Sequence, residues 1–333
     1  MVDREGVQEI FRLPLMDLLS RAGAVHRTVF EPGVVQLSSL LSIKTGGCPE
    51  NCAYCPQSAH HETGLAREKL MPVDDVRRAA QTAKLSGASR FCMGAAWRQV
   101  TDGPEFDRVV DMVREVHSIG LEVCCTLGML TEPQAVRLKK AGLHSYNHNI
   151  DSSRAFYEKI ISTRGYDDRL ETIGNVRRAG LSVCTGGIIG MGETESDRID
   201  FLHQLASFDP TPESVTVNAL VPIEGTPLEG RAPATAFELA RVIATARILM
   251  PKAMVRLSAG RKSLSAEGQL ICLMAGANSL FLGDKLLTSP NPSVDEDASL
   301  FRELGLKAAR GTAEPLKTAE PQIAAEPQAT ATA

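Results

Sequence analysis

Short apolar runs alternate with amphipathic stretches along most of the chain, in units of roughly 30 to 40 residues. The short runs have the length and residue types of strands, whereas the longer stretches carry apolar residues at helical spacing. Regular alternation of this kind is typical of a parallel sheet. The predicted strands are Gln36–Ile43, Ser89–Met93, Glu122–Leu127, Ser145–Ile150, Ser182–Ile189, Ser214–Leu220, Met254–Leu257 and Ser279–Leu282.

Signals for helix ends agree with this alternation. The acidic first turn after Pro72 opens one helix, because proline and carboxylates favour a helix N-terminus. Gly120, Gly142 and Gly180 stand where three others should stop. The remaining predicted helices are Pro104–Ser118, Glu132–Lys140, Tyr166–Arg178, Thr194–Ser207, Thr235–Leu249, Ser265–Ala275 and a last one near Leu300–Leu304.

Strands and helices in this number favour a closed (β/α)8 barrel of the TIM type over residues 36–310. The alternative is an open doubly wound sheet, which usually has fewer strands and one clear phosphate-binding turn. Residues 1–35 predict an N-terminal helical extension. Residues 311–333 repeat Ala-Glu-Pro and offer little apolar surface to bury, so we predict a disordered tail there.

Composition narrows the functional classes. Aromatic residues make up 5% of the chain and the net charge is −4, which argues against binding to nucleic acid or to an anionic membrane. The N-terminus lacks the pattern of a secretory signal, and no run of apolar residues is long enough to span a membrane. Eight cysteines without such a signal predict a reducing, cytoplasmic location, where clustered cysteines hold metal or perform redox chemistry.

Three cysteines follow the first predicted strand at the spacing C-x3-C-x2-C: Cys48, Cys52 and Cys55. Three thiolates around a four-iron cluster leave one iron without a protein ligand, and that iron can bind a substrate or cofactor. The alternative is a zinc site that His60 or His61 completes. The close spacing favours the iron–sulfur cluster.

Further cysteines lie near the ends of later strands. Cys92 ends the second, Cys124 or Cys125 the third and Cys184 the fifth, and Arg256 lies in the seventh. Strand ends of a barrel converge on one face, so these side chains predict a second metal site. Alternatively the cysteines are small core residues and the arginine, whose guanidinium stays protonated, forms an ion pair.

Polar side chains follow the fourth and sixth strands. Asn147, Asn149 and Asp151 alternate, which on a strand directs all three to one face, and Asn218 joins them from the sixth strand. Amides both donate and accept hydrogen bonds, which suits the binding of a polar ligand. The alternative is turn chemistry at strand ends, to which Asn and Asp are prone.

The cysteine motif on this barrel-like repeat resembles the radical S-adenosylmethionine superfamily, and Tyr54 matches the superfamily's aromatic position within the motif. Longer segments resemble the biotin synthase family: Leu41–Glu50, Arg90–Trp97, Tyr146–Asp151 and Val255–Arg261. The likeness runs from about residue 10 to about residue 306, which leaves out only the tail.

This resemblance implies two clusters and two small molecules. A [4Fe–4S] cluster would be held by Cys48, Cys52 and Cys55, and a [2Fe–2S] cluster by Cys92, Cys124, Cys184 and Arg256. The family's pattern Gly-Leu-Glu-x-Cys selects Cys124, so that Cys125 would face the helices. S-adenosylmethionine would be contacted by Tyr54, Asn149, Asp151 and Ile188, and the substrate by Asn147, Asn149 and Asn218.

The implied reaction is sulfur insertion into dethiobiotin to give biotin. A 5′-deoxyadenosyl radical, formed from S-adenosylmethionine at the [4Fe–4S] cluster, would abstract hydrogen, and the [2Fe–2S] cluster would supply the sulfur. The family also implies a homodimer and an electron donor such as flavodoxin or ferredoxin. The alternatives are another radical S-adenosylmethionine barrel enzyme, such as a cofactor maturase, and a non-catalytic iron–sulfur redox sensor.

Overall fold

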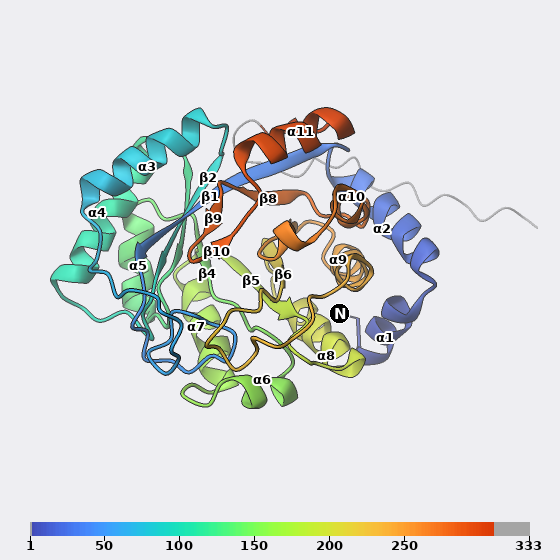
Figure 1. Ribbon diagram of the computed structural model, residues 1–333, viewed down its shortest axis with the longest axis horizontal. Helices are drawn as coiled ribbons and strands as arrows, with labels where there is room; N and C mark the ends of the chain where they lie inside the picture. Colours follow the sequence, from blue (N-terminus) through green and yellow to red (C-terminus); the bar gives the residue numbers. More distant parts are fainter. Residues whose placement is uncertain (1, 310–333) are drawn as a thin grey trace, which may run out of the picture.

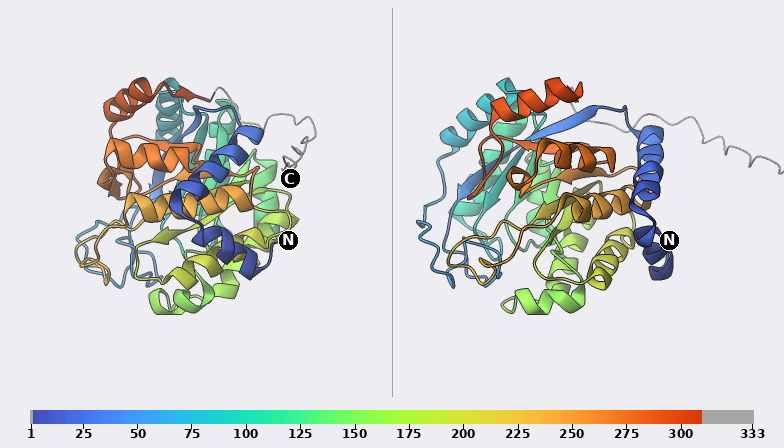
Figure 2. Two further views of the ribbon diagram at one scale, coloured as in Figure 1. Left: turned by 90° about the vertical axis from the view of Figure 1, so that its right-hand side faces the viewer. Right: turned by 45° about the vertical axis from the view of Figure 1, so that its right-hand side comes forward.

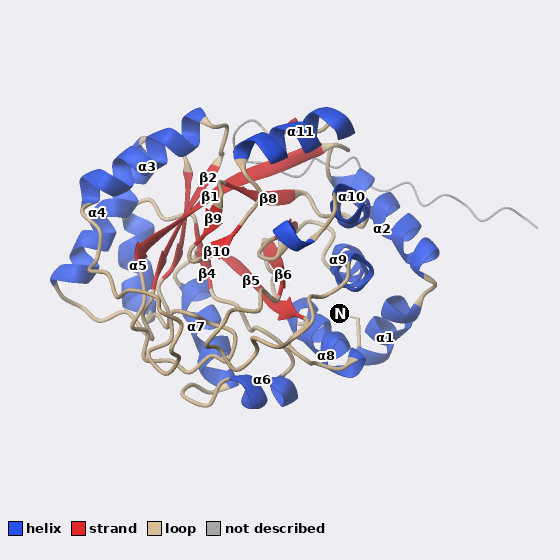
Figure 3. Ribbon diagram, in the orientation of Figure 1, coloured by secondary structure: helices blue, strands red, loops and turns tan. Residues whose placement is uncertain are grey.

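A computed structural model describes residues 2–309 and shows a barrel of parallel strands with helices outside it (Figure 1, Figure 3). Strands β1 to β8 follow one another in sequence order, and β8 pairs with β1 to close the barrel. The predicted (β/α)8 barrel is therefore confirmed. Its strands are β1 (Val34–Lys44), β2 (Arg90–Ala95), β3 (Glu122–Thr126), β4 (Ser145–Asn147), β5 (Ser182–Ile189), β6 (Ser214–Ala219), β7 (Met254–Leu257) and β8 (Ser279–Leu282).

Helices connect these strands on the outer face, and several begin with a side chain that caps the first turn. Thr235, for example, accepts a hydrogen bond from the Glu238 backbone while the Glu238 carboxylate accepts from Thr235. No helix within residues 2–309 is long and apolar enough to cross a membrane. The helices after β1 are α3 (Val73–Leu85), α4 (Pro104–Ser118), α5 (Glu132–Lys140), α6 (Arg154–Ile160), α7 (Tyr166–Arg178), α8 (Glu195–Ala206), α9 (Ala236–Leu249), α10 (Ala266–Met274) and α11 (Val294–Leu304).

The predicted N-terminal helical extension is also present, as α1 (Arg4–Arg12) and α2 (Leu15–Val29). These helices lie across α8 and α9 on the outside of the barrel (Figure 2). Arg241 of α9 donates to the backbone carbonyl of Leu13 at 2.8 Å, between the two helices. The extension therefore packs on the barrel and takes no part in the barrel wall.

Three features differ from the prediction. Helix α6 was not predicted, and β4 ends at Asn147, although we expected a strand to Ile150. Beyond Asn147 the chain keeps only separate backbone bonds with β5, among them those from His148 to Cys184 and from Asp151 to Gly186, and Asp151 has a left-handed φ of 66°. After β8 the chain also forms the short strands β9 (Lys285–Leu286), β10 (Ser289–Pro290) and β11 (Lys307–Ala308). The predicted disordered tail, 311–333, lies outside the described residues.

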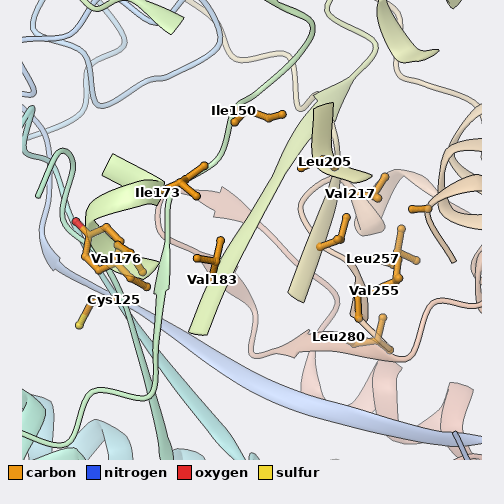
Figure 4. Packing of buried hydrophobic residues seen from close by; sticks show 14 of the residues in the cluster. Cys125, Ile150, Ile173, Val176, Val183, Leu205, Val217, Val255, Leu257 and Leu280 are labelled. Carbon is orange, nitrogen blue, oxygen red and sulfur yellow. The ribbon is translucent and has the colours of Figure 1, made fainter. Parts of the chain in front are cut away.

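Alternation along the strands separates the outer core from the barrel interior. Cys125, Val183, Val217 and Val255 point outward and pack beneath the helices, with Ile173 and other apolar side chains (Figure 4). Their neighbours in sequence point the other way, into the barrel. Those inward neighbours include Cys124, Cys184, Thr216 and Arg256, so the strand register brings reactive side chains together.

Candidate functional site

A cavity of about 320 Å³ opens at the C-terminal ends of the barrel strands. Two groups of cysteines meet at its wall. We call Cys48, Cys52 and Cys55 the loop cysteines, and Cys92, Cys124 and Cys184 the barrel cysteines. All three loop cysteines border the cavity, as do Cys92 and Cys124, while Cys184 is fully buried behind them. The other predicted contact residues border the same cavity: Tyr54, Asn147, Asn149, Asp151, Ile188, Asn218 and Arg256.

The loop cysteines are held by a tight backbone fold after β1. The Cys48 amide donates to the carbonyl of Gln57 at 2.8 Å, and the Ala59 amide donates to the carbonyl of Cys48 at 2.7 Å. Gly46 precedes the loop with a φ of 73°, and a Cβ there would lie 2.7 Å from the Ala66 carbonyl oxygen. A glycine is therefore required at this position for the chain to enter the loop.

A second set of bonds ties this loop to the segment between α6 and α7. The side chain of Asn51 accepts from the Ser162 amide at 3.0 Å and donates to the Ser162 hydroxyl at 2.7 Å. The hydroxyl of Thr163 donates to the buried carboxylate of Glu50. The position of the loop cysteines thus depends on residues more than 100 positions later in the chain.

Burial controls the protonation of the loop cysteines. It raises the pKa of Cys52 to about 11 and the pKa of Cys55 to about 12. Backbone amides of Glu50 and Gln57 donate to the sulfurs of Cys48 and Cys55, which favours the thiolate forms. Without a bound metal the loop cysteines are therefore thiols, and metal binding must displace their protons.

The imidazoles proposed as zinc ligands are engaged elsewhere. Nε2 of His60 lies 3.1 Å from the Pro49 carbonyl oxygen, and Nε2 of His61 lies 3.0 Å from that of Cys52. Across residues 2–309, no three His, Cys, Asp or Glu side chains gather closely enough to hold a single metal ion. Three thiols on one loop, all bordering the cavity, are the donor set that a four-iron cluster with one open iron requires.

The barrel cysteines point inward from β2, β3 and β5. Cys92 is the register partner of Cys124. With Phe281 and Leu286 the three form a small buried cluster that is separate from the main core. Cys125, next to Cys124, belongs to the main core beneath the helices (Figure 4). The side chains therefore lie as the family pattern implies, and the role of Cys124 as a ligand stays a prediction.

Hydrogen bonds among the barrel cysteines set their protonation. The bond from Cys124 lowers the pKa of Cys92, and the charges of Arg256 and Arg90 lower it further against the effect of burial. The bond with Cys184 lowers the pKa of Cys124. The bond with Cys92 and burial raise that pKa by more, so the pKa of Cys124 is about 12. One of the three thiols thus has a lowered pKa.

Arg256 is buried beside these cysteines with 1% of its surface exposed. Its Nε donates to the Ser279 hydroxyl at 2.9 Å and its Nη2 to the Ser38 hydroxyl at 3.1 Å. Its guanidinium carbon lies 4.5 Å from the centre of the Phe281 ring. No carboxylate pairs with Arg256 within the described residues. Because a buried charge is costly without a counter-charge, the site suits an anionic group bound by the cysteines.

Amide side chains line the cavity between the two cysteine groups. Nδ2 of Asn147 donates to the Thr126 hydroxyl at 3.0 Å, while its buried Oδ1 has no partner among the described residues. Oδ1 of Asn149 accepts from the Thr216 hydroxyl at 2.9 Å. Asn218 bonds the Gly187 carbonyl and the Ala259 amide. Neighbours fix the orientation of all three amides, so each presents a defined polar edge.

Asp151 joins the loop to the barrel. Its Oδ2 accepts from the Tyr54 hydroxyl at 2.9 Å and from the guanidinium of Arg169 on α7. Asp151 is 2% exposed, and Arg169 supplies its counter-charge. The strand prediction for Asn147, Asn149 and Asp151 was wrong beyond Asn147, yet all three still border the cavity because the chain turns along its rim.

Ile188 borders the cavity from β5, next to a glycine pair. At Gly187 a Cβ would lie 2.4 Å from the Asp151 carbonyl oxygen and 2.7 Å from Phe201. Asp151 and Gly187 form an isolated parallel β-bridge, in which the Ile188 amide donates to the Asp151 carbonyl at 2.9 Å. Glycine at this position therefore lets the segment after β4 approach β5.

Sequence patterns did not reveal several cavity residues. Arg169 lies 18 residues after Asp151 on an ordinary amphipathic helix, so no spacing marks it. The hairpin of β9 and β10 also lines the cavity, through residues 286–289. Leu287 has a left-handed φ of 52° and packs on Gly94, where a Cβ would lie 2.8 Å from its Cδ2. Two-residue strands give no detectable periodicity, which is why this hairpin was missed.

Models of two protein families match the chain. The Radical SAM superfamily matches residues 42–205, and the Biotin and Thiamin Synthesis associated domain matches residues 216–307. The first match contains the loop cysteines, Cys92, Cys124 and Cys184, and the second contains Arg256 and Asn218. The two matches therefore divide the cavity wall between them.

Curated relatives are similar over most of their length. The biotin synthase of Christiangramia forsetii is 58% identical over 303 residues, which cover 91% of this chain and 84% of the relative. The biotin synthase of Methylorubrum populi is 60% identical over 301 residues, covering 90% and 88%. That of Sorangium cellulosum is 60% identical over 295 residues, covering 89% and 84%.

Solved structures share the fold. Methylornithine synthase superposes with a TM-score of 0.76 at 20% identity, covering 93% of this chain and 95% of that one. HydG, a maturase of the [FeFe]-hydrogenase, superposes with a TM-score of 0.77 at 17% identity, covering 92% and 72%. At such identities the likeness concerns the fold alone. The identity to the curated relatives is far higher and extends over both matched domains, and the chain therefore belongs to the biotin synthase family.

Proposed function

We propose that this protein is a sulfurtransferase that inserts sulfur into dethiobiotin to give biotin. Its radical S-adenosylmethionine domain and its family membership support an iron–sulfur cluster and S-adenosylmethionine as cofactors. One observation carries the proposal: the loop cysteines and two barrel cysteines border one cavity. A substrate between the two groups would lie within reach of both.

The loop cysteines would hold a [4Fe–4S] cluster, which when bound supplies the electron that cleaves S-adenosylmethionine. The cavity side of the loop leaves room for that cofactor. Tyr54, Asn149, Asp151 and Ile188 would contact it. Asp151 is suited to bind ribose hydroxyls, because its carboxylate pairs with Arg169 and is thereby held in position.

The barrel cysteines and Arg256 would hold a [2Fe–2S] cluster, which when bound supplies the sulfur atom. Three thiols and a cation without a carboxylate partner form a donor set suited to such an anionic group. Position deep in the barrel, beneath Phe281 and Leu286, would keep water from the sulfur.

Dethiobiotin carries a polar ureido ring at one end and a carboxylate at the other, joined to apolar carbons. Asn147, Asn149 and Asn218 would bind its polar groups. The unpartnered Oδ1 of Asn147 is an acceptor suited to a ureido N–H. The hairpin residues 286–289 would cover the apolar part and help to exclude water.

The direct test is an anaerobic reaction of the reconstituted protein with reductant, S-adenosylmethionine and dethiobiotin. We expect mass spectrometry to detect 5′-deoxyadenosine and biotin. Formation of 5′-deoxyadenosine without biotin would refute sulfur insertion and leave only the superfamily chemistry. Absence of both products under a competent reductant would refute the whole proposal.

The family further suggests a homodimer in the cytoplasm that receives electrons from a flavodoxin or ferredoxin. The reducing environment that eight free cysteines need is consistent with that location. Sedimentation of the reconstituted protein would test the dimer. Replacement of the chemical reductant by reduced flavodoxin or by reduced ferredoxin would test each electron donor.

A further inference from the structure

A buried ion pair lies directly beneath the barrel cysteines. Arg90 stands two residues before Cys92 on β2, and Glu122 two residues before Cys124 on β3, so both side chains point into the barrel. Arg90 Nε lies 2.7 Å from Glu122 Oε2, and the two side chains are 6% and 8% exposed. The pair therefore forms the polar layer next to the proposed [2Fe–2S] site.

Glu122 also connects to the other side of that site. Nε2 of Gln36 donates to Glu122 Oε2 at 3.3 Å. The same Gln36 accepts, through Oε1, from the Ser279 hydroxyl at 3.1 Å and from Arg256 Nη2 at 3.4 Å. One carboxylate thus orients Arg90 directly and reaches Arg256 through a single amide.

The guanidinium of Arg90 faces the barrel cysteines. Glu122, Cys124, Cys92 and Cys184 raise its pKa against the effect of burial, in that order of importance. Its Nη1 is buried and has no hydrogen-bond partner within residues 2–309. A buried donor without a partner is costly, so a ligand of the barrel cysteines is expected to accept its hydrogen bond.

Glu122 also affects the net charge next to the proposed [2Fe–2S] cluster. The core of an oxidised [2Fe–2S] cluster is dicationic, and three thiolates leave the assembly with one negative charge, so any further charge beside it alters its reduction potential. Arg90 would add an uncompensated positive charge in a site that water does not screen. Glu122 cancels the charge of Arg90, so the ion pair brings no net charge to the cluster.

We propose that Glu122 is a positioning residue for sulfur insertion, which orients Arg90 directly and Arg256 through Gln36 and balances the charge of Arg90. This inference rests on the proposed function, because it requires that cluster at the barrel cysteines. Loss of the carboxylate leaves a net positive charge beside the cluster. Since a positive charge favours the reduced, more negative state, the reduction potential of the cluster rises.

The experiment compares anaerobically reconstituted wild type, Glu122→Gln and the double variant Arg90→Gln/Glu122→Gln. Redox titration of the [2Fe–2S] absorbance is the readout, independent of turnover. We expect a more positive midpoint potential in Glu122→Gln and a return toward wild type in the double variant, which lacks both charges. Glu132→Gln is the matched control, because its exposed ion pair with Arg178 lies on the outer helices and should leave the potential unchanged.

Arg90→Gln alone serves if Glu122→Gln fails to fold. It leaves the carboxylate unopposed, so we expect a more negative potential. Equal potentials in wild type and either single variant would overturn the inference while the proposed function stands. A double variant no different from Glu122→Gln would also overturn it. If the wild type takes up no [2Fe–2S] cluster at all, the proposed function fails and the inference fails with it.

Discussion

The loop cysteines and the barrel cysteines face one cavity but are built in different ways. Cys48, Cys52 and Cys55 lie within eight residues, and local backbone bonds fix the loop around them. Cys92, Cys124 and Cys184 come from three strands and meet only because the barrel closes in the correct register. The spacing of the first site is local, although bonds from Glu50 and Asn51 to residues 162–163 hold its loop in place, whereas the second site exists only in the whole fold.

The electrostatics of the two groups differ as well. Burial raises the pKa of every loop thiol, and backbone amides favour the thiolates of Cys48 and Cys55. Buried arginines lie near both groups, but the barrel thiols also bond to one another, and the bond from Cys124 lowers the pKa of Cys92. A loop site that binds and releases S-adenosylmethionine needs an open side. A site that holds a sulfur donor needs burial from water and a balanced charge.

Loss of one cysteine from each group should give the largest effects and should separate the two sites. We expect Cys52→Ser to abolish both 5′-deoxyadenosine and biotin, since the proposed function assigns radical formation to the loop. Cys184→Ser should abolish biotin but retain 5′-deoxyadenosine formation. Both products are measured by mass spectrometry in the same reaction. If both variants lose the same products, the assignment of radical formation to the loop and of sulfur donation to the barrel is wrong.

The orientation of neighbouring cysteines on β3 provides the next test. Cys124→Ser should remove the [2Fe–2S] absorbance and the biotin product. Cys125→Ser is the matched control, because its side chain packs beneath the helices (Figure 4). It should retain the absorbance and lose only stability, by about 1 to 3 kcal/mol, since it buries a hydroxyl. Normal absorbance in Cys124→Ser would contradict the inward ligand role.

The same contrast explains how much of the site could be predicted from the sequence. The spacing of the loop cysteines is visible within eight residues, so local chemistry identifies it. Alternation on β3 shows that only one of Cys124 and Cys125 points inward, but the choice required the family pattern. Arg169 and the link through Gln36 to Glu122 depend on contacts between distant elements, and no periodicity marks them.

The fold was predictable for a related reason. Long elements such as α4 and α9 have apolar faces that repeat over several turns, and their predicted bounds agree closely with the structure. Helix α6 has seven residues and follows the left-handed turn at Asp151, so its pattern is too short to detect. The strands of the β9–β10 hairpin have two residues each. The elements that were missed are short, and of these two the hairpin borders the cavity.

Gly187→Ala should affect the barrel site more than the loop site. The added methyl would lie 2.4 Å from the Asp151 carbonyl oxygen, so β5 must shift against β4. We expect a loss of stability of about 2 to 3 kcal/mol by denaturant unfolding. Because Cys184 lies on β5, [2Fe–2S] content should fall while [4Fe–4S] content is kept. Gly230→Ala is the control, since no atom lies within 4 Å of its Cβ position; equal losses in both variants would contradict the expected strain.

Tyr54→Phe should have the smallest effect and should be confined to the loop site. It removes the hydroxyl that donates to Asp151 at 2.9 Å, while Arg169 continues to pair with that carboxylate. The loss of one hydrogen bond predicts about 1 kcal/mol, seen as a rise of less than about tenfold in the KM for S-adenosylmethionine. The [2Fe–2S] absorbance should not change, because Tyr54 does not touch the barrel cysteines. A variant that loses that absorbance, yet binds S-adenosylmethionine normally, would show that the loop and the barrel site are coupled through Asp151 more strongly than their separate construction implies.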